Sequence, residues 1–181
     1  AGAIAAEGLF ADAPVLLSAG GSAFLDLCAA KLPAAIDGRP VERVIRPGCY
    51  VTHDHGLYAG LTRVPELRRA MEVWGTVQSV PEPELAIVGV GKRDVSNDSG
   101  PPVPLFVHRP GEADLPVPAT GMTVASLWDQ HLSLAAPPGT LRVGDLVGFG
   151  ISHPCATFDR WRALLTVDER YRVTGAVTTL F

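Results

Sequence analysis

The hydrophobic pattern of the first third of the chain predicts alternating strands and helices. Residues 14–18 form a short apolar strand that ends at Gly20 and Gly21, and residues 23–32 then predict a helix. A second strand is predicted at residues 41–46. This order of strand, helix and strand is typical of an α/β fold.

The remaining two thirds of the chain have the pattern of β-strands. Residues 71–80 alternate between apolar and polar side chains, and residues 85–90 form a continuous apolar strand. A short strand is predicted within 123–131, and the segment 141–149 predicts a turn that leads into another strand. Residues 161–180 predict a closing hairpin.

This change of pattern predicts two domains with a boundary near residues 65–70. Residues 1–66 hold only two or three βα units, which are too few to close a barrel by themselves. Residues 67–181 are long enough to fold as an antiparallel barrel or sandwich. The predicted fold class is therefore α/β followed by an all-β domain.

Composition narrows the classes of function that the sequence fits. The 181 residues carry a formal net charge of −4, so the chain lacks the basic surface that binds nucleic acid. No apolar run is long enough to span a bilayer, and residues 1–6 lack the basic leader of a signal peptide. The three cysteines, Cys28, Cys49 and Cys155, are widely separated and predict no disulfide framework. We therefore expect a cytoplasmic protein that binds neither nucleic acid nor membranes.

Three chemically capable side chains, His153, Cys155 and Asp159, fall within seven residues. If the strand at 141–149 continues through Pro154, His153 and Cys155 point to the same face of a sheet. Imidazole nitrogen and thiolate sulfur are ligands that zinc prefers. The alternative is a buried cysteine beside a capping histidine. Two ligands would not complete a structural zinc site, but they fit an open one.

Three other polar segments are candidates for a site. The glycine pair before the predicted helix offers backbone N–H groups to an anionic phosphate, with an ordinary βα turn as the alternative. His53 and His55 either line a site or lie in solvent, and we prefer the second interpretation. The loop at 91–100, with its charged side chains, is either part of a site or a solvated hairpin.

Four motifs together resemble a known enzyme family. They are Ser18-Ala19-Gly20-Gly21-Ser22, Ile45-Arg46-Pro47-Gly48-Cys49-Tyr50, Gly91-Lys92-Arg93-Asp94-Val95-Ser96-Asn97-Asp98 and Ser152-His153-Pro154-Cys155. Nearly the whole chain resembles the C-terminal half of the D-threonine aldolase / D-serine dehydratase-like enzymes, and most closely their amino acid deaminase branch. The resemblance implies a pyridoxal-phosphate enzyme of the alanine racemase type. Residues 1–66 would then be the last βα units of a TIM barrel, and residues 67–181 the β domain that carries the metal site.

The resemblance also implies which residues hold the cofactor. Its phosphate would be bound by the loop that matches Gly20, Gly21 and Ser22, and by a second backbone contact that matches Gly48 and Cys49. Arg46 matches the arginine that faces the pyridine nitrogen in the alanine racemase relatives. In the dehydratase branch another group can take that place.

The resemblance assigns a divalent metal to His153 and Cys155. Aldolase members tend to carry aspartate at the second position, and a thiolate there favours zinc. The Schiff-base lysine of the family has no match, because Lys31 ends a predicted helix and Lys92 lies in the β domain. We therefore expect a C-terminal fragment or a separate subunit that is inactive without an N-terminal barrel half.

The implied activity of the intact enzyme is on D-β-hydroxy amino acids, and its relatives imply a homodimer. Dehydration with deamination would give a keto acid and ammonia, whereas retro-aldol cleavage would give glycine and an aldehyde. Cys155 favours the first reaction. An alternative of another class is a catalytically inactive β module that binds a metal or a partner protein. A racemase would need a second catalytic base, and Tyr171 lies in a poor context for that role.

Overall fold

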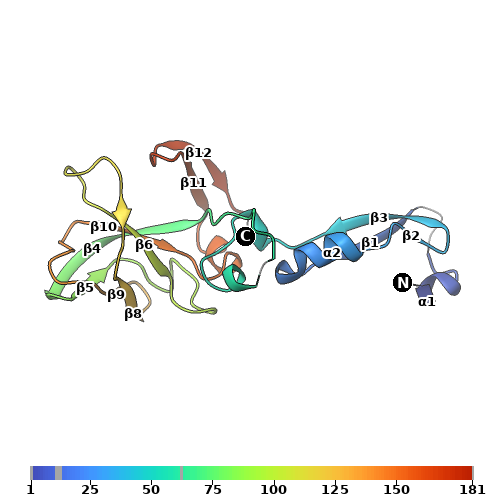
Figure 1. The fold of residues 1–181 in the computed structure, drawn as a ribbon, viewed down its shortest axis with the longest axis horizontal. Helices are drawn as coiled ribbons and strands as arrows, with labels where there is room; N and C mark the ends of the chain where they lie inside the picture. The colour runs from blue at the N-terminus through green and yellow to red at the C-terminus, as the bar shows by residue number, and fades with distance from the viewer. Residues whose placement is uncertain (1, 11–13, 62, 181) are drawn as a thin grey trace. The chain divides into compact units, whose positions relative to one another are not determined.

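The computed structural model describes residues 2–10, 14–61 and 63–180 (Figure 1). The chain divides into two units: Ala1–Val51 with Leu61–Leu67, and Thr52–Gly60 with Arg68–Phe181. The first unit is α/β and the second is dominated by strands, as the sequence pattern predicts. The assignment of residues 1–66 and 67–181 to two functional domains stays a prediction.

The first unit is a small sheet with one helix between its parallel strands. Its elements are α1 (Gly2–Ala6), β1 (Val15–Ala19), η1 (Ser22–Phe24), α2 (Leu25–Lys31), β2 (Ala35–Ile36), β3 (Arg39–Ile45) and η2 (Cys49–Val51). The strand order is β1-β3-β2, in which β1 and β3 are parallel and β2 is antiparallel to β3. The strands and the helix predicted between residues 14 and 46 are therefore confirmed.

This unit leaves much of its apolar surface exposed. Val15 and Ile36 are buried, but Leu16 in β1 is 64% exposed and Phe24 is 58% exposed. Parallel strands in complete α/β folds usually have both faces covered. The exposure agrees with a piece of a barrel rather than a closed one.

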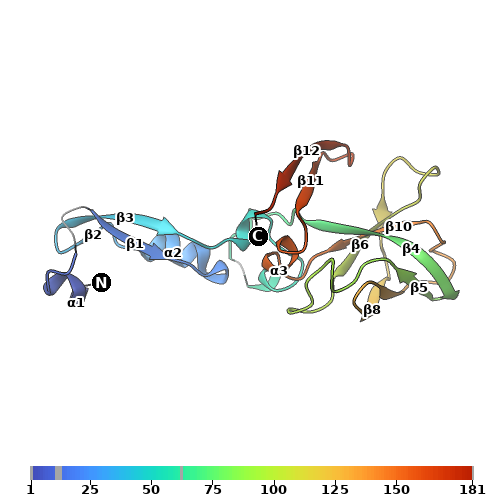
Figure 2. The ribbon, with the colours of Figure 1, turned by 180° about the vertical axis from the view of Figure 1, so that it is seen from behind.

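The second unit is built on one seven-stranded antiparallel sheet. Its elements are η3 (Tyr58–Gly60), β4 (Glu72–Glu82), β5 (Leu85–Val88), β6 (Val103–His108), β7 (Val117–Pro118), β8 (Thr123–Leu127), β9 (Leu132–Ala135), β10 (Leu146–Gly150), α3 (Cys155–Phe158), β11 (Ala163–Val167) and β12 (Val173–Thr178). The sheet order is β7-β6-β10-β4-β5-β9-β8, and it curls so that β8 approaches β6 (Figure 2). The result is a half-barrel, and β11 and β12 form a separate hairpin.

The core of the half-barrel is made by the inward positions of its strands. In β4 the buried residues alternate, with Val73 and Val77 facing inward. β10 is central and lies between β6 and β4, so Val147 and Phe149 are fully buried. The sequence pattern did not predict β6 and β9, because prolines or short length masked their strand signal. Both strands are part of the seven-stranded sheet.

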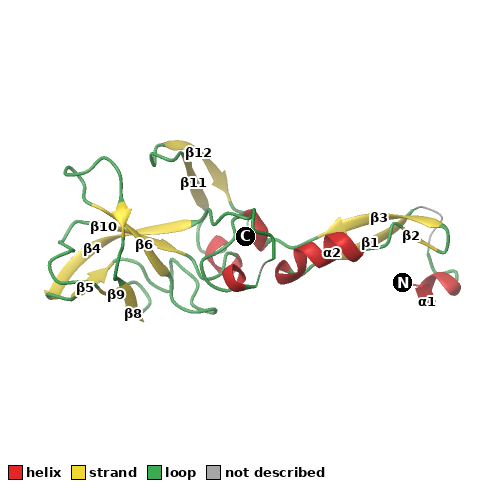
Figure 3. Cartoon of the chain, in the orientation of Figure 1, coloured by secondary structure: helices red, strands yellow, loops and turns green. Residues whose placement is uncertain are grey.

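One local prediction near the end of the sheet is wrong. The strand does not continue through Pro154, because β10 ends at Gly150 and Cys155 begins the short helix α3 (Figure 3). Pro154 has φ −63° and ψ −47°, which is helical backbone. A proline suits the start of a helix, since the N–H that it lacks would have no intrahelical partner there.

Two further expectations concern cysteines and membranes. Cys28, Cys49 and Cys155 form no disulfide in the described part of the chain. None of the helices formed by residues 2–10, 14–61 and 63–180 combines the length and the apolar character that a bilayer crossing requires.

Candidate metal centre and phosphate loops

Three loops of the second unit converge beside His153. The N–H of His55 donates to the carbonyl of Ile151 at 2.9 Å, and that of Leu57 donates to the carbonyl of Ser152 at 3.1 Å. From the other side, the Ser152 hydroxyl donates to the carbonyl of Ser96 at 3.1 Å. Segments 52–60 and 91–100 are thereby fixed to the chain that follows β10.

Asp54 gives the first of these loops its shape. Its side chain is buried, and Oδ1 accepts hydrogen bonds from the N–H groups of Gly56 at 2.9 Å, Tyr58 at 3.0 Å and Ala59 at 3.3 Å. A carboxylate that collects several N–H groups in this way satisfies donors at the start of the η3 turn. The loop is therefore an ordered part of the site.

His153 and Cys155 lie together, although not by the predicted strand geometry. Their ligand atoms are within 4.8 Å of one another. The sequence predicted that the two side chains would share one face of a strand. Instead, the turn at Pro154 and the start of α3 bring them together. The His153 side chain is only 20% exposed, while Cys155 is exposed to solvent. Imidazole and thiolate are a donor set that suits zinc, so these residues fit a divalent cation.

The His153 ring is held from two sides. Its Nδ1 lies 2.7 Å from Oδ2 of Asp98, and the ring of Tyr58 meets it edge to face at 5.9 Å and 75°. The hydroxyl of Ser96, a buried residue, donates to Oδ1 of Asp98. The Thr157 hydroxyl donates to the carbonyl of His153 at 3.1 Å. The ring therefore has a fixed place at the meeting point of the loops.

The prediction that His53 and His55 lie in solvent is wrong. His53 is buried, adopts φ +54° and accepts a hydrogen bond at Nδ1 from the N–H of Asp54 at 2.7 Å. His55 is half-buried, and its ring packs on Gly150, where a Cβ would lie 2.3 Å from Nδ1. Burial lowers the pKa of His55, and the charge of Arg69 lowers it further, which favours the neutral form of the ring.

In the first unit, the two predicted phosphate loops follow neighbouring parallel strands. Gly20, Gly21 and Ser22 come after β1, and Arg46 to Cys49 come after β3. Ala19 pairs with Ile45, and the N–H of Cys49 donates to the Ser22 hydroxyl at 3.4 Å. The carboxyl ends of parallel strands share one sheet edge, so the structure brings these residues together.

The backbone at this edge fits an anionic group. Gly21 has φ +142°, which favours glycine, and the carbonyls of the described residues accept no backbone hydrogen bond from the N–H groups of Gly21 and Ser22. Gly48 has open space where a Cβ would stand. Arg46 turns toward β1, where its Nε donates to the Ser18 hydroxyl at 2.5 Å. A phosphate at this edge would therefore be bound mainly by backbone N–H groups.

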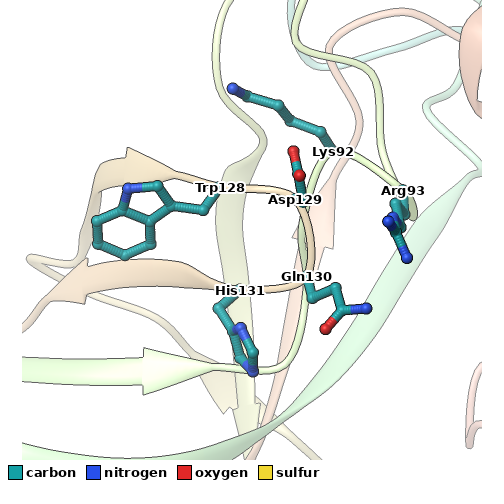
Figure 4. A pocket seen from close by; sticks show the side chains of 6 residues that line it. All are labelled: Lys92, Arg93, Trp128, Asp129, Gln130 and His131. Carbon is teal, nitrogen blue, oxygen red and sulfur yellow. The ribbon is translucent and has the colours of Figure 1, made fainter.

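A shallow pocket of about 490 Å³ lies elsewhere on the second unit. It is lined by Lys92, Arg93, Trp128, Asp129, Gln130 and His131 (Figure 4). The two loops that form it are close, since the N–H of Lys92 donates to the carbonyl of Trp128 at 2.8 Å. Figure 4 shows Trp128 and Arg93 extending to opposite sides, so the lining side chains do not point toward one common place where a ligand would bind. The start of the loop at 91–100 thus lines this pocket, and its end contacts His153.

Sequence reasoning missed Asp98 as the partner of the His153 ring. The residue lies in a motif that the sequence singles out, but it is 55 positions from His153. The signal in the sequence was the polar loop at 91–100, which directly follows a buried strand. Such a loop indicates a possible site, but it does not identify which carboxylate faces which histidine. The roles of the cofactor and metal residues themselves stay predictions.

One protein family and several solved structures are similar to this chain. The sequence model of the D-ser_dehydrat family, a serine dehydratase domain, matches residues 70–167. D-threonine aldolase from Filomicrobium marinum is a structural neighbour with a TM-score of 0.72 and 22% identity, covering 96% of this chain and 42% of that protein. D-threo-3-hydroxyaspartate dehydratase from Delftia sp. HT23 has a TM-score of 0.65 and 19% identity, covering 98% and 46%.

Two more matches extend this set of neighbours. A cysteine-to-alanine mutant of D-threo-3-hydroxyaspartate dehydratase, in the metal-free form, has a TM-score of 0.61 and 19% identity, covering 98% of this chain and 46% of that one. An alanine racemase-like protein from Idiomarina loihiensis has a TM-score of 0.56 and 19% identity, covering 76% and 38%. No curated protein matches the chain in sequence.

These neighbours establish the fold, and the family match establishes the membership. The fold is that of the C-terminal part of alanine racemase-type enzymes, an incomplete barrel followed by an antiparallel β domain, as predicted. The chain spans less than half the length of these structures. Because the family match extends over more than half of the 181 residues, the chain belongs to the D-ser_dehydrat family of serine dehydratase domains.

Proposed function

We propose that this chain is the C-terminal portion of a lyase that depends on pyridoxal phosphate and a divalent metal. The observation that carries the proposal is the pair His153 and Cys155, whose ligand atoms lie within 4.8 Å in a domain of this family. The proposed substrates are D-β-hydroxy amino acids. Membership of the family and the enzymes among the structural neighbours support this class of reaction.

The proposed metal is Zn²⁺, because a thiolate ligand favours zinc over manganese or magnesium. His153 and Cys155 would hold it and leave positions open for water or substrate. When bound, a Lewis-acidic cation would polarise the substrate β-hydroxyl.

The proposed cofactor site is the edge formed by the loops after β1 and β3. Gly20, Gly21 and Ser22 would bind the phosphate through main-chain N–H groups, with Gly48 and Cys49 adding the second contact. Pyridoxal phosphate, when bound, supplies an electron sink for the bonds at the substrate Cα. Arg46 would orient the cofactor ring, and its bond to Ser18 restrains its side chain near this edge.

The proposed reaction is dehydration with deamination, which yields a keto acid and ammonia. Cys155 favours it over retro-aldol cleavage, which would yield glycine and an aldehyde. Neither Lys31, at the end of α2, nor Lys92, in the second unit, lies in the two phosphate loops. We therefore assign the Schiff-base lysine to an N-terminal barrel half, and we propose that the assembled enzyme is a cytoplasmic homodimer.

A metal-binding measurement tests the first half of this proposal. The purified chain, freed of metal, is titrated with Zn²⁺ by calorimetry in parallel with His153→Ala and Cys155→Ala. One Zn²⁺ per chain, with binding lost in both variants, is the expected result. Cys28→Ser is the matched control, because it removes a thiol from α2 and leaves the metal pair intact. A chain that binds no zinc, or variants that bind it unchanged, would refute the metal site.

An activity measurement tests the second half. The DNA upstream of the Ala1 codon is read for a strand that ends in lysine, and the longer product is assayed with pyridoxal phosphate on D-serine, D-threonine and D-3-hydroxyaspartate. Keto acid and ammonia are expected. Glycine and aldehyde would identify retro-aldol cleavage instead. Zinc binding without turnover of any of these substrates would favour the inactive metal-binding module.

A further inference from the structure

The carboxylate of Asp98 lies directly against the ring of the proposed metal ligand His153. Oδ2 of Asp98 lies 2.7 Å from Nδ1 of His153, which is a short, charge-assisted contact. A carboxylate in its ionised form only accepts hydrogen bonds. The ring must therefore carry its proton on Nδ1 to satisfy this contact.

We infer that Asp98 is a positioning residue that keeps His153 in the Nδ1–H form and leaves Nε2 to bind the cation. This inference rests on the metal site of the proposed function. Ligating histidines commonly donate their second N–H to a carboxylate, which fixes the tautomer and the orientation of the ring. The loop at 91–100 supplies that partner here, from a strand connection far from His153 in sequence.

Further hydrogen bonds hold Asp98 in its position beside His153. The Asp98 side chain is 51% exposed. Its Oδ1 nevertheless accepts a hydrogen bond from the hydroxyl of Ser96, a residue that is 1% exposed. The carbonyl of Ser96 in turn accepts the hydroxyl of Ser152, the neighbour of His153. Both ends of the contact between Asp98 and His153 are thus tied to the same pair of serines.

The ring has little freedom to leave this partner. Tyr58 lies edge to face with it at 5.9 Å, and Thr157 binds the carbonyl of His153 at 3.1 Å. With the ring confined and Nδ1 occupied, Nε2 is the nitrogen that remains for a ligand. Loss of an outer partner of this kind typically weakens metal binding by about 10–100-fold.

The tautomer is measured first, in the metal-free chain at pH 8, by ¹⁵N NMR of the histidine rings. The His153→Ala variant identifies the resonances. A ring protonated on Nδ1 is expected in the wild type, and Asp98→Ala should shift the population toward the Nε2–H form. A wild-type ring that is protonated on Nε2 overturns the inference, whether or not the chain binds a metal.

Zinc affinity is measured next on the full chain by competition with a chelating dye. Asp98→Ala is expected to weaken binding by about 10–100-fold, and Asp98→Asn by much less, because the amide oxygen still accepts from Nδ1–H. Asn97→Ala, an exposed neighbour in the same loop, should leave the affinity unchanged. Thermal melting of each variant reports whether it folds.

The outcomes separate this inference from the proposed function. A wild-type chain that binds no zinc refutes the proposed metal site, while the NMR result still decides the role of Asp98. A chain that binds zinc equally well with Asp98→Ala refutes the positioning role alone. If Asp98→Asn is as weak as Asp98→Ala, Asp98 is itself a ligand, and the inference is overturned.

Discussion

Gly56 lies directly against the backbone of Ser152, the residue before the proposed metal ligand. A Cβ at Gly56 would stand 2.7 Å from the carbonyl oxygen of Ser152 and 2.8 Å from its Cα. The same carbonyl accepts the N–H of Leu57 at 3.1 Å. The close contact between the loop at 52–60 and the chain after β10 therefore requires glycine at this position.

Gly56→Ala is expected to destabilise the second unit by about 2 kcal/mol. The added methyl group meets main-chain atoms that cannot move aside without breaking the bond from Leu57, and overpacking of this kind typically costs about 1–3 kcal/mol. Urea unfolding followed by tryptophan fluorescence measures the change. Gly60→Ala is the matched control, because no atom lies within 4 Å of a Cβ at that position in the same loop. Equal stability of the two variants would show that the contact is unimportant.

Cys155→Asp is expected to change which metal the site prefers. A carboxylate is a harder ligand than a thiolate, so the affinity for Zn²⁺ should fall while the ratio of Mn²⁺ to Zn²⁺ affinity rises. The local backbone should tolerate the change, since Cys155 is an exposed residue at the first position of α3, where acidic side chains are favourable. Titration with each metal measures both affinities. An unchanged ratio would mean that Cys155 is not a ligand.

Asp145 makes the stability of the second unit dependent on pH. Arg109 donates to both of its carboxylate oxygens, at 2.8 Å and 2.7 Å, and the N–H of Arg142 donates at 2.8 Å. Burial by itself would raise the pKa of Asp145, but the hydrogen bonds and charges of these two arginines outweigh it and lower the pKa.

The direction of the pH effect follows from that lowered pKa. The ionised carboxylate stabilises the fold above the unfolded pKa of about 3.9, and this contribution is lost as the pH falls through the lower folded pKa. Asp145→Asn should therefore be less stable than the wild type at pH 7, and the difference should shrink below about pH 4. Urea midpoints across this range measure it. Glu112→Gln, a change at an exposed partner of Arg109, should have little effect. A pH-independent difference would contradict the prediction.

Tyr171 anchors the hairpin of β11 and β12 and should titrate at unusually high pH. Its hydroxyl donates to Oε2 of Glu72 at 3.2 Å, and its ring packs edge to face on Trp74 at 5.3 Å. Burial, followed by the charge and hydrogen bond of Glu72, raises its pKa to about 12.

The stabilising effect of the neutral phenol is present below the ordinary tyrosine pKa of about 10 and is lost as the pH rises through about 12. An ultraviolet absorbance titration should show a late step near pH 12, which Tyr171→Phe removes. Tyr50→Phe, at an exposed tyrosine, should retain that step. A step that survives Tyr171→Phe would assign the high pKa to another residue.

The pattern of apolar residues was sufficient for most of the secondary structure. β1, β4 and β5 were predicted because apolar side chains repeat with the period of a strand and because glycine or proline ends each run. β6 was not predicted, since prolines mark its segment and its strand signal comes from pairing with β10. The strand through His153 and Cys155 was wrong because Pro154 suits both a strand end and the first turn of a helix.

The candidate site was likewise predicted only in part from the sequence. By itself the sequence determined the ligand types, an imidazole and a thiol two positions apart, and the glycines after each strand of the first unit, because both are properties of neighbouring residues. Only the tertiary structure decided that Asp98 faces His153 and that Gly56 contacts Ser152. These contacts join loops that follow different strands, and they depend on the order and curl of the whole sheet. Local periodicity carries no information about that order, since it reports which face of a strand is buried and not which loops meet beyond its end.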